Sequence, residues 1–415
     1  MKHEGLVTMA ADQVSGKVTL FKREESEAVY RIPSLLYLDR DAVFLAFAEK
    51  RSSSSDLDAK SLVLRRGNFQ DGSVKWENEV QLKTAGQPGY RSMNPCPVYE
   101  QQQGVVYLFF NCIKEGVSER QQIFCGKDAT KLCYVLSRDA GVTWGPLTDL
   151  TDTVLGPWVG HWGTFSVGPG HGLQQACGTL IIPAYTYIIS QSCRLLPPWF
   201  RTAPHPFYFY SQDGGESWQV GEPVTKYQAA ECELAEIAIA NNNRVLYCNA
   251  RTKGQARVEA VSLEPGCFEI ARLAKGLVDS KRGCQGSVVS FPVPDVQPNT
   301  GEQVSWLLYT HPTGERGFWG HRHNRTNLGI FVNPRPLQKH QWRGPWVIQT
   351  GPCGYSDLAY VGSAATFACL YECGTDVSWE RIVFCLFSAK DVMKNVSSRH
   401  GSEPAEGRQL LAGAL

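Results

Sequence analysis

The stretch Tyr30–Arg51, YRIPSLLYLDRDAVFLAFAEKR, predicts a β-hairpin that carries an arginine near each end. Two apolar runs rich in β-forming residues flank the polar turn Asp39-Arg40-Asp41. Arg31 begins the first run and Arg51 ends the second. Arginine is rarely buried without a partner, so the two are either exposed strand-end residues or part of a guanidinium cluster that binds an anion. The hairpin by itself leaves both interpretations open.

The composition is that of a globular chain with little net charge. Of the 415 residues, 43% are hydrophobic and 20% are charged, and the formal net charge is +1. This balance argues against disorder and gives no basic face for nucleic acid. No apolar run reaches the roughly 18 residues of a membrane span, and the N-terminus, MKHEGLVTMAADQ, lacks the apolar core of a signal peptide. We therefore expect a protein that is cytoplasmic or peripherally associated with plasma or endosomal membranes.

The 14 cysteines follow no paired framework. Several lie inside apolar runs, as Cys133, Cys248, Cys369 and Cys385 do, which is typical of reduced core residues in an intracellular protein. No spacing of cysteine and histidine resembles a zinc site. The sequence thus predicts neither a metal ion nor a cofactor, and it does not indicate the oligomeric state.

Short strands separated by Gly, Pro, Asn and Asp turns run through most of the chain. Counting the weaker runs gives about two dozen strands, which favours a large radial β-fold over a sandwich. Short helical turns are expected only near Ser118–Ile123 and Lys390–Asn395. We expect a short N-terminal extension (1–20), a single domain (21–393) and a disordered polar tail (394–415).

A repeated motif indicates hairpin turns of one kind. SRDAGVTW (Ser137–Trp144) and SQDGGESW (Ser211–Trp218) share the pattern Ser-x-Asp-x-Gly-x-Ser/Thr-Trp, and SLEPGCF (Ser262–Phe268) is a degraded copy. The aspartate should accept bonds from backbone N–H groups of the turn, the glycine should take positive φ, and the tryptophan should pack beneath. These aspartates therefore serve the fold rather than catalysis.

The YRIP stretch followed by these Asp boxes resembles the sialidases, above all the vertebrate cytosolic and plasma-membrane-associated members. Further ordered matches cover nearly all of Tyr30–Ser388, among them LAFAEKR, RSMNPCPVYE, TFSVGPGHG, ECELAE, NARTKGQARVEA and GYSDLA. The resemblance implies a six-bladed β-propeller of four-stranded antiparallel blades. It also implies a metal-free exo-α-sialidase that removes terminal sialic acid, with retention, from gangliosides and other glycoconjugates. The stretches GPCGY and LYECG are closer to the membrane-associated, ganglioside type.

Three arginines match the residues with which the family binds the substrate carboxylate: Arg31, Arg251 and Arg325. A guanidinium fork suits a planar carboxylate better than lysine does. Arg316 and Arg322 are the alternatives to Arg325, because the loop before it could shift the match. Arg51 would help to position the carboxylate or the sugar.

The resemblance assigns the nucleophile to Tyr355 and its base to Glu231. Sialidases use tyrosine because a carboxylate nucleophile would be repelled by the carboxylate on the reacting carbon. A phenol needs a close base, and Glu233 competes for that role because residues two apart share a strand face. Asp56 matches the general acid/base, with Asp58 as a near alternative.

Sugar recognition falls, by the same matching, to both polar and apolar side chains. The residues are Glu119, Tyr185, Tyr187, Met93 and Asn94. Tyr185 and Tyr187 alternate along one strand and could line one wall of a pocket.

Three other interpretations remain at this stage. A catalytically silent, lectin-like propeller is opposed by competent residues at the nucleophile, base and acid positions. A trans-sialidase has the same motifs, and a protein-interaction propeller of the WD or kelch type would show repeats that are missing here.

The segment Ser190–Pro206, SQSCRLLPPWFRTAPHP, is an irregular apolar insertion after the tyrosine pair. Its side chains Leu195, Leu196, Trp199 and Phe200 either form an exposed rim that touches glycolipid or membrane, or pack against neighbouring blades. The residues favour neither over the other. The expected partners are thus a sialylated glycolipid, oligosaccharide or glycoprotein, with possible peripheral membrane contact and no nucleic acid.

Overall fold

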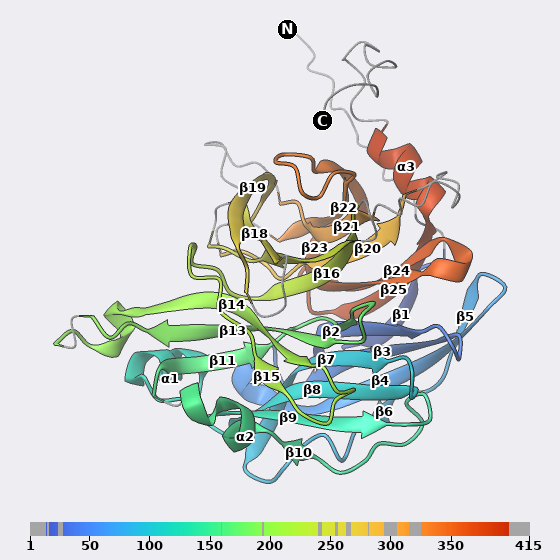
Figure 1. The fold of residues 1–415 in the computed structure, drawn as a ribbon. Coiled ribbons are helices and arrows are strands. Elements are labelled where there is room, and N and C mark those ends of the chain that lie inside the picture. The colour runs from blue at the N-terminus through green and yellow to red at the C-terminus, as the bar shows by residue number, and fades with distance from the viewer. Residues whose placement is uncertain are drawn as a thin grey trace, which may run out of the picture.

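The computed structural model describes residues 14, 16–23, 28–158, 160–192, 195–239, 243–253, 256–262, 267–280, 282–293, 305–314 and 325–397. Within these ranges the chain is built almost entirely of antiparallel strands, so the all-β class is confirmed. The strands follow one another in meanders, and Figure 1 shows successive sheets in successive colours.

The first four sheets each take up one continuous part of the chain. The first holds β2 (Val29–Leu38), β3 (Val43–Arg51), β4 (Ala59–Gln70), β5 (Ser73–Trp76) and β6 (Val80–Gln81). The second holds β7 (Tyr90–Glu100), β8 (Val105–Lys114), β9 (Thr130–Ser137) and β10 (Thr148–Asp149). The third holds β11 (Trp162–Val167), β12 (Leu173–Gln174), β13 (Leu180–Ile189), β14 (Thr202–Ser211) and β15 (Gln219–Val220). The fourth holds β16 (Cys232–Ala238), β17 (Arg244–Ala250), β18 (Ala256–Ser262) and β19 (Ile270–Val278).

The fifth sheet has seven strands and closes the ring. It comprises β20 (Ser287–Pro292), β21 (Ser305–Pro312), β22 (Thr326–Asn333), β23 (Arg343–Val361), β24 (Thr366–Cys373), β25 (Arg381–Ser388) and β1 (Val18–Lys22). β1 pairs with β25, so the two ends of the described chain share one sheet. Hydrogen bonding along the first half of β23 is to β22, and along its second half to β24. Two four-strand groups therefore share β23, and the count of six blades stays a prediction.

The helices are short and lie outside the sheets. They are α1 (Glu119–Cys125), α2 (Thr151–Leu155) and α3 (Ala389–Ser397), with 3₁₀ turns at Asp56–Asp58, Gly156–Trp158, Pro198–Phe200 and Gly362–Ala364. α1 and α3 cover the two helical turns expected from the sequence. No helix in the described ranges is long and apolar enough to cross a membrane.

The core lies between consecutive sheets. Along β3, Leu45 and Phe47 pack toward the second sheet, whereas Phe44 and Ala46 pack toward the fifth. Successive strand residues point to opposite faces, so a strand covered on both sides must be apolar throughout. This packing explains the continuous apolar runs in the sequence. It also buries the four cysteines named above, none of which forms a disulfide.

The first strands of the groups meet at the centre. β2 lies against β7 and β23, and β20 lies against β16 and β23. One end of these central strands therefore gathers residues from distant parts of the chain. The domain boundaries stay predictions: β1 begins inside the expected extension, α3 crosses residue 393, and residues 398–415 lie outside the described part.

The two full Asp boxes form the expected turns. In the second, Asp213 accepts hydrogen bonds from Ser211 Oγ (2.7 Å) and from the Ser217 backbone N–H (2.9 Å). Gly215 has a φ of 98°, and an added Cβ would lie 2.4 Å from Tyr107, so only glycine fits there. Trp218 is buried and donates to the Gly215 carbonyl (3.2 Å). Residues 263–266 of the degraded copy lie outside the described part.

We expect Asp213→Ala to lower the free energy of unfolding by about 1–2 kcal/mol, because two donors of the turn lose their acceptor. The hydrogen bonds from Ser217 hold the pKa of Asp213 at about 2, below its ordinary value of 3.8. The parent and Asp213→Ala should therefore show their full difference in free energy of unfolding above about pH 4. That difference should shrink as the pH falls toward 2. Urea unfolding at pH 7 and pH 3 measures it. Glu216→Ala, in the same exposed turn, is the control, and an equal loss in both variants would contradict the prediction.

Candidate active site

Several of the matched residues meet at one end of the central strands. Arg31 is in β2, Tyr355 is in β23, and Glu231 immediately precedes β16. Arg251 follows β17 and Arg325 precedes β22. The site is thus assembled from chain segments more than 300 residues apart, and only the closed ring of sheets brings them together.

A phenol, a carboxylate and a guanidinium form the centre of this cluster. The Tyr355 hydroxyl donates a hydrogen bond to Glu231 Oε1. Arg251 Nη1 lies 2.5 Å from Glu231 Oε2 and 3.1 Å from the Tyr355 hydroxyl oxygen. Tyr355 and Glu231 are both buried. Glu231 is therefore placed to accept the phenolic proton, and Arg251 is placed to stabilise the charges on both groups.

Glu233, the alternative to Glu231, points elsewhere. It is fully buried and accepts hydrogen bonds from the Val288 backbone N–H (3.0 Å) and from Gln285 Nε2 (3.2 Å). Glu231 precedes the first residue of β16, and so strand alternation does not force the two glutamates to make the same contacts. The structure brings Glu231, and not Glu233, to Tyr355.

The electrostatic surroundings of Tyr355 keep it protonated until a base acts. Burial and the neighbouring Glu231 carboxylate raise the pKa of Tyr355 well above 10, whereas Arg251 and Arg325 oppose that rise. The guanidinium carbons of Arg31 and Arg325 lie 5.8 Å and 5.5 Å from the centre of its ring. Three guanidiniums thus surround one neutral phenol. Such a concentration of positive charge is suited to an anionic ligand.

Each of these arginines also donates a hydrogen bond to a protein acceptor that fixes its side chain. Arg31 Nε donates to Glu372 Oε1 at 2.7 Å. Arg251 donates to the Arg282 carbonyl, and Arg325 donates to the Gly283 carbonyl (2.9 Å). Consecutive carbonyls of one loop therefore fix two of the three guanidiniums. The alternatives to Arg325, Arg316 and Arg322, lie outside the described residues.

Glu372 is the residue that the sequence analysis missed. Its buried carboxylate accepts hydrogen bonds from Arg31 Nε and from the backbone N–H groups of Ile32 (2.9 Å) and Tyr355 (3.1 Å). One carboxylate thus orients an arginine of the cluster and fixes the backbone of the tyrosine. Gly354 makes room for it, since a Cβ there would lie 2.1 Å from Glu372 Oε2. The signal in the sequence was an acidic residue inside an otherwise apolar strand.

The backbone of β2 is distorted beside Arg31. Ile32 has a φ of 57°, which is strained for a β-branched residue, and the pairing with β3 shifts between Arg31 and Ser34. β7 has the same feature at Asn94, with a φ of 56° and a register shift after Met93. Bulges of this kind redirect side chains, and the bond from Ile32 N–H to Glu372 holds the first one in place.

Arg51 belongs to a separate, buried set of ion pairs. Its Nε donates to Glu49 Oε2 (2.7 Å) and its Nη1 to Asp56 Oδ1 (2.6 Å). Burial raises the pKa of Glu49, against the effects of Arg51 and of the Asn94 backbone N–H, which donates to it at 2.6 Å. Of the two arginines that begin and end the hairpin, only Arg31 therefore lies at the phenol. The guanidinium of Arg51 is held by two carboxylates.

Asp56 lies on an exposed turn. Its side chain is 74% exposed, although its carboxylate touches Arg51. Asp58, the alternative, instead accepts a hydrogen bond from Ser53 Oγ (2.5 Å) within the loop. Asp56 is thus the acid that lies next to the arginine and is also open to an incoming ligand.

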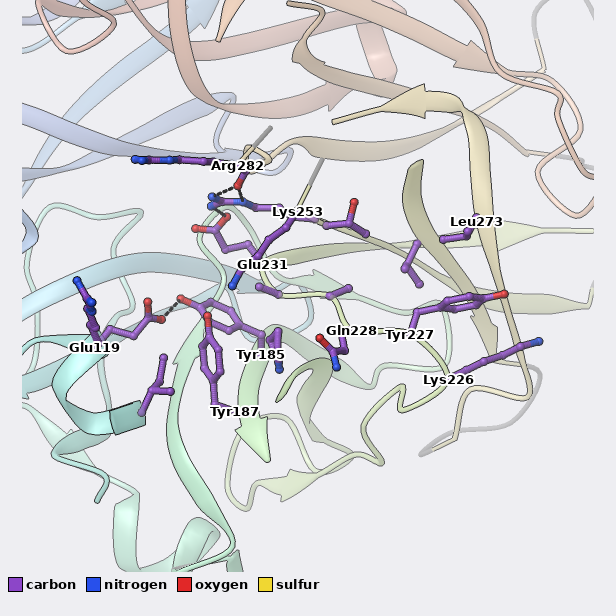
Figure 2. Close-up of a pocket in the computed structure, with 18 residues that line it drawn as sticks. Glu119, Tyr185, Tyr187, Lys226, Tyr227, Gln228, Glu231, Lys253, Leu273 and Arg282 are labelled. Carbon is purple, nitrogen blue, oxygen red and sulfur yellow. Dashed lines mark hydrogen bonds and ion pairs between the residues drawn. The ribbon is translucent and has the colours of Figure 1, made fainter. Parts of the chain in front are cut away.

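The sugar-side residues divide into two groups. The Tyr185 hydroxyl donates to Glu119 Oε1 (3.0 Å), and the rings of Tyr185 and Tyr187 lie 6.2 Å apart, as Figure 2 shows. Glu119 is open to solvent, but the protein around it still raises its pKa by desolvation. Met93 is buried in a small apolar cluster, and the Asn94 side chain donates to the Val167 carbonyl (3.3 Å). Met93 and Asn94 do not line the cavity described next, and their part in sugar recognition stays a prediction.

A cavity of about 860 Å³ opens beside the phenol. Glu119, Tyr185 and Tyr187 line one end, and Glu231 lies between that end and a second end lined by Tyr227 (Figure 2). Arg251 also lines the cavity. This volume is in the range of small-molecule sites. The other members of the cluster, Arg31, Arg325 and Tyr355, do not line this cavity, and neither do Arg51 and Asp56.

One buried group could in principle ligate a metal. Ligand atoms of His171, Glu233 and Asp357 lie within 4.8 Å of one another. Asp357 already accepts bonds from His171 Nδ1 (2.7 Å), from the Leu35 backbone N–H (2.7 Å) and from Ser287 Oγ (2.9 Å). Protein donors also satisfy Glu233, and burial raises its pKa. These contacts describe a hydrogen-bonded support beneath the site rather than a metal centre.

The comparisons with known proteins concern the fold and the family. A family model described as a BNR repeat-like domain matches residues 43–366. The fold resembles Trypanosoma rangeli sialidase with a TM-score of 0.68 at 18% identity, covering 92% of this chain and 61% of that chain. These matches define a propeller built of BNR repeats and confirm the fold class.

The curated relatives identify the family. Sialidase-3 of Bos taurus is 44% identical over 409 residues, covering 91% of this chain and 94% of that protein. Sialidase-2 of Mus musculus is 41% identical over 397 residues, covering 94% and 99% of the two chains. The chain belongs to the sialidase family, as its motifs predict.

We expect Glu372→Gln to destabilise the protein by about 1–3 kcal/mol, because the amide NH₂ would face buried N–H donors that need an acceptor. Urea unfolding measures the loss. Glu115→Gln, at an exposed loop position, is the control. Equal unfolding midpoints for parent and Glu372→Gln would show that the carboxylate does not hold this part of the site.

Proposed function

We propose that this member of the sialidase family is an exo-α-sialidase that removes terminal α-linked sialic acid from glycoconjugates with Tyr355 as its nucleophile. The single observation that carries the proposal is the bond from the Tyr355 hydroxyl to Glu231 inside a ring of three guanidiniums. A sialic acid carries a carboxylate on its anomeric carbon. A site that pairs a carboxylate-binding cluster with a neutral nucleophile suits that carbon.

Substrate binding would place the carboxylate among Arg31, Arg251 and Arg325. Their guanidiniums are already oriented by Glu372 and by the carbonyls of Arg282 and Gly283, so little side-chain order remains to be gained on binding. This preorganisation holds the anomeric carbon near the phenol oxygen. It also fixes the orientation of that carbon relative to the attacking oxygen.

In the first step Glu231 takes the phenolic proton while the Tyr355 oxygen bonds to the anomeric carbon. The bond from that carbon to the leaving oxygen breaks, and Asp56 gives the leaving oxygen a proton. In the second step Asp56 removes a proton from water, whose oxygen displaces Tyr355, and Glu231 returns the proton to the phenolate. Two displacements at one carbon give net retention.

Asp56 is suited to the acid role because it is exposed and yet held beside the cluster by Arg51. The Ser52–Ser55 loop that leads to it can adjust so that the carboxyl reaches the leaving group. Arg51, which is buried against Glu49, would act by holding Asp56 rather than by binding the substrate carboxylate.

Residues that line the cavity would recognise the remainder of the sugar. Glu119, Tyr185 and Tyr187 present hydroxyls and a carboxylate to it, as hydroxyl recognition requires. Met93 and Asn94 would act indirectly, by shaping β7 next to Glu49. Within the broader class of sialylated glycolipids, oligosaccharides and glycoproteins, the stretches GPCGY and LYECG favour gangliosides, because they resemble the membrane-associated type.

Tyr355→Phe and Glu231→Gln should each lower kcat on a fluorogenic sialoside by about 10²–10⁴-fold, because one removes the attacking oxygen and the other its base. Tyr360→Phe, in the same strand but outside the cluster, is the control and should keep full activity. A parent that binds sialosides without turnover would instead favour the lectin-like function. Full activity of Tyr355→Phe would reject the proposed nucleophile.

Asp56→Ala should depend on the leaving group. We expect a loss of about 10²–10⁴-fold in kcat on a natural sialyl-galactoside, but a clearly smaller loss on an aryl sialoside, whose phenolate leaves without a proton. Asp58→Ala is the control, with nearly parental rates on both substrates. Equal losses on the two substrates for Asp56→Ala would contradict the acid role.

A further inference from the structure

Exposed apolar side chains gather at one place next to the cavity. In the described part of the chain, eleven large hydrophobic residues are exposed, and five of them lie on α1 or within residues 195–200, two segments joined by the stacking of Phe124 on Trp199. We call this group the aromatic rim; it consists of Phe124, Leu195, Leu196, Trp199 and Phe200. Leu195 is 101% exposed and Phe200 is 71% exposed. Burying such side chains is favourable, so a concentration of them at the surface points to an interaction.

Ring stacking and hydrogen bonds give the aromatic rim a defined structure. The ring of Trp199 stacks on that of Phe124, with centres 4.1 Å apart and planes within 3° of parallel, and Phe200 lies 5.7 Å from Trp199. At the base of the segment Arg201 Nη1 donates to the Ser190 carbonyl (2.7 Å), and the Ser190 N–H donates to the Arg201 carbonyl (2.8 Å). The rim is therefore presented by a hairpin end that is closed at its base.

The rim projects from the molecule. Figure 1 shows the ends of β13 and β14 reaching beyond the neighbouring strands, with α1 close to them. The same two elements form the cavity: β13 carries Tyr185 and Tyr187, and α1 begins with Glu119. A surface that covers the rim would therefore lie directly beside the sugar-side end of the cavity.

The chemistry of the rim fits a lipid surface better than a protein. A standard protein interface uses about 20–30 residues a side, whereas the rim is a narrow, protruding end of five apolar side chains. Tryptophan and phenylalanine are favourable at the boundary between headgroups and acyl chains. Three basic residues lie near the rim residues in the sequence, namely Arg120, Lys127 and Arg201.

Within the described residues of 118–128 and 190–206, the three basic residues exceed the two acids, Glu119 and Asp128, by one charge. Glu119 turns to Tyr185, and Asp128 accepts a bond from the Thr130 backbone N–H (2.9 Å). The cationic surroundings are therefore complementary to anionic headgroups, which add attraction to the insertion of the apolar side chains.

We propose that the aromatic rim inserts into the headgroup boundary of an anionic lipid membrane and so holds the cavity against lipids that carry a sialylated headgroup. The proposal of a membrane contact is based on the rim alone. The choice of a glycolipid as the preferred substrate rests in addition on the proposed function. The interpretation of the Ser190–Pro206 insertion as a loop buried between blades is excluded for the four rim residues that it supplies, because all four are exposed.

The test compares the full chain with the variant Trp199→Ser/Phe200→Ser. Co-sedimentation is measured with phosphatidylcholine vesicles, with and without phosphatidylserine. Val142→Ser/Leu337→Ser removes two exposed apolar side chains far from the rim in sequence and is the matched control. Thermal unfolding of all three proteins checks that they are folded.

The parent and the control should bind vesicles, more tightly when phosphatidylserine is present, and the rim variant should lose about tenfold or more in partition. On a vesicle-embedded sialylated glycolipid, kcat/KM of the rim variant should fall in the same proportion, whereas kcat/KM on a small soluble sialoside should not change.

Two outcomes would overturn the proposal: no vesicle binding by the parent, or equal binding by the parent and the rim variant. Binding only to vesicles that contain a membrane protein would show that a protein covers the rim, and would overturn it as well. Absence of turnover on both substrates would count against the proposed function alone, because vesicle binding is measured separately.

Discussion

Three guanidiniums of like charge must be held around the Tyr355 phenol, and the rest of the site depends on this constraint. Their mutual repulsion is offset by two buried carboxylates, of which Glu372 is itself fixed by backbone N–H groups. Glu231 lies between Arg251 and the phenol, and Glu372 ties Arg31 to the backbone of the tyrosine's own strand. Removing either carboxylate would leave positive charge uncompensated in a buried region, which proteins tolerate poorly. The cluster is thus stable without substrate and still has capacity for one more carboxylate.

The ring of sheets makes this arrangement possible because it brings strand ends from the whole chain to one centre. Strands covered on both faces are continuously apolar, as β3 is before Glu49, and this apolar packing supports the polar centre. The local distortion at Ile32 is a cost of directing Arg31 inward, and the Glu372 carboxylate compensates for it through the Ile32 N–H. Fold and site are therefore coupled through a few polar contacts between distant strands.

Much of this was predictable from the sequence, for physical reasons that differ by residue. The Asp-box turns follow from local bonding, and Tyr355, Glu231 and the arginines followed from ordered family motifs. The family match favoured Glu231 as the base, but the residues alone left Glu233 open, because a spacing of two residues only says that side chains can share a face. Glu372 and the burial of Arg51 depend on contacts between strands, which no local pattern encodes. Met93 and Asn94 were assigned to sugar recognition by the family match, and that role stays a prediction: they lie at the register shift of β7, which no local pattern predicts.

The central claim is that the Tyr355 oxygen forms a covalent bond with the anomeric carbon. Fluorine on the adjacent sugar carbon slows the second displacement, so a 2,3-difluorosialic acid should accumulate as an adduct on the protein. Digestion and mass spectrometry of the quenched enzyme locate that adduct. We predict a mass increase on the peptide that contains Tyr355, and none in Tyr355→Phe. An adduct on another residue, or turnover with no adduct at all, would contradict the mechanism.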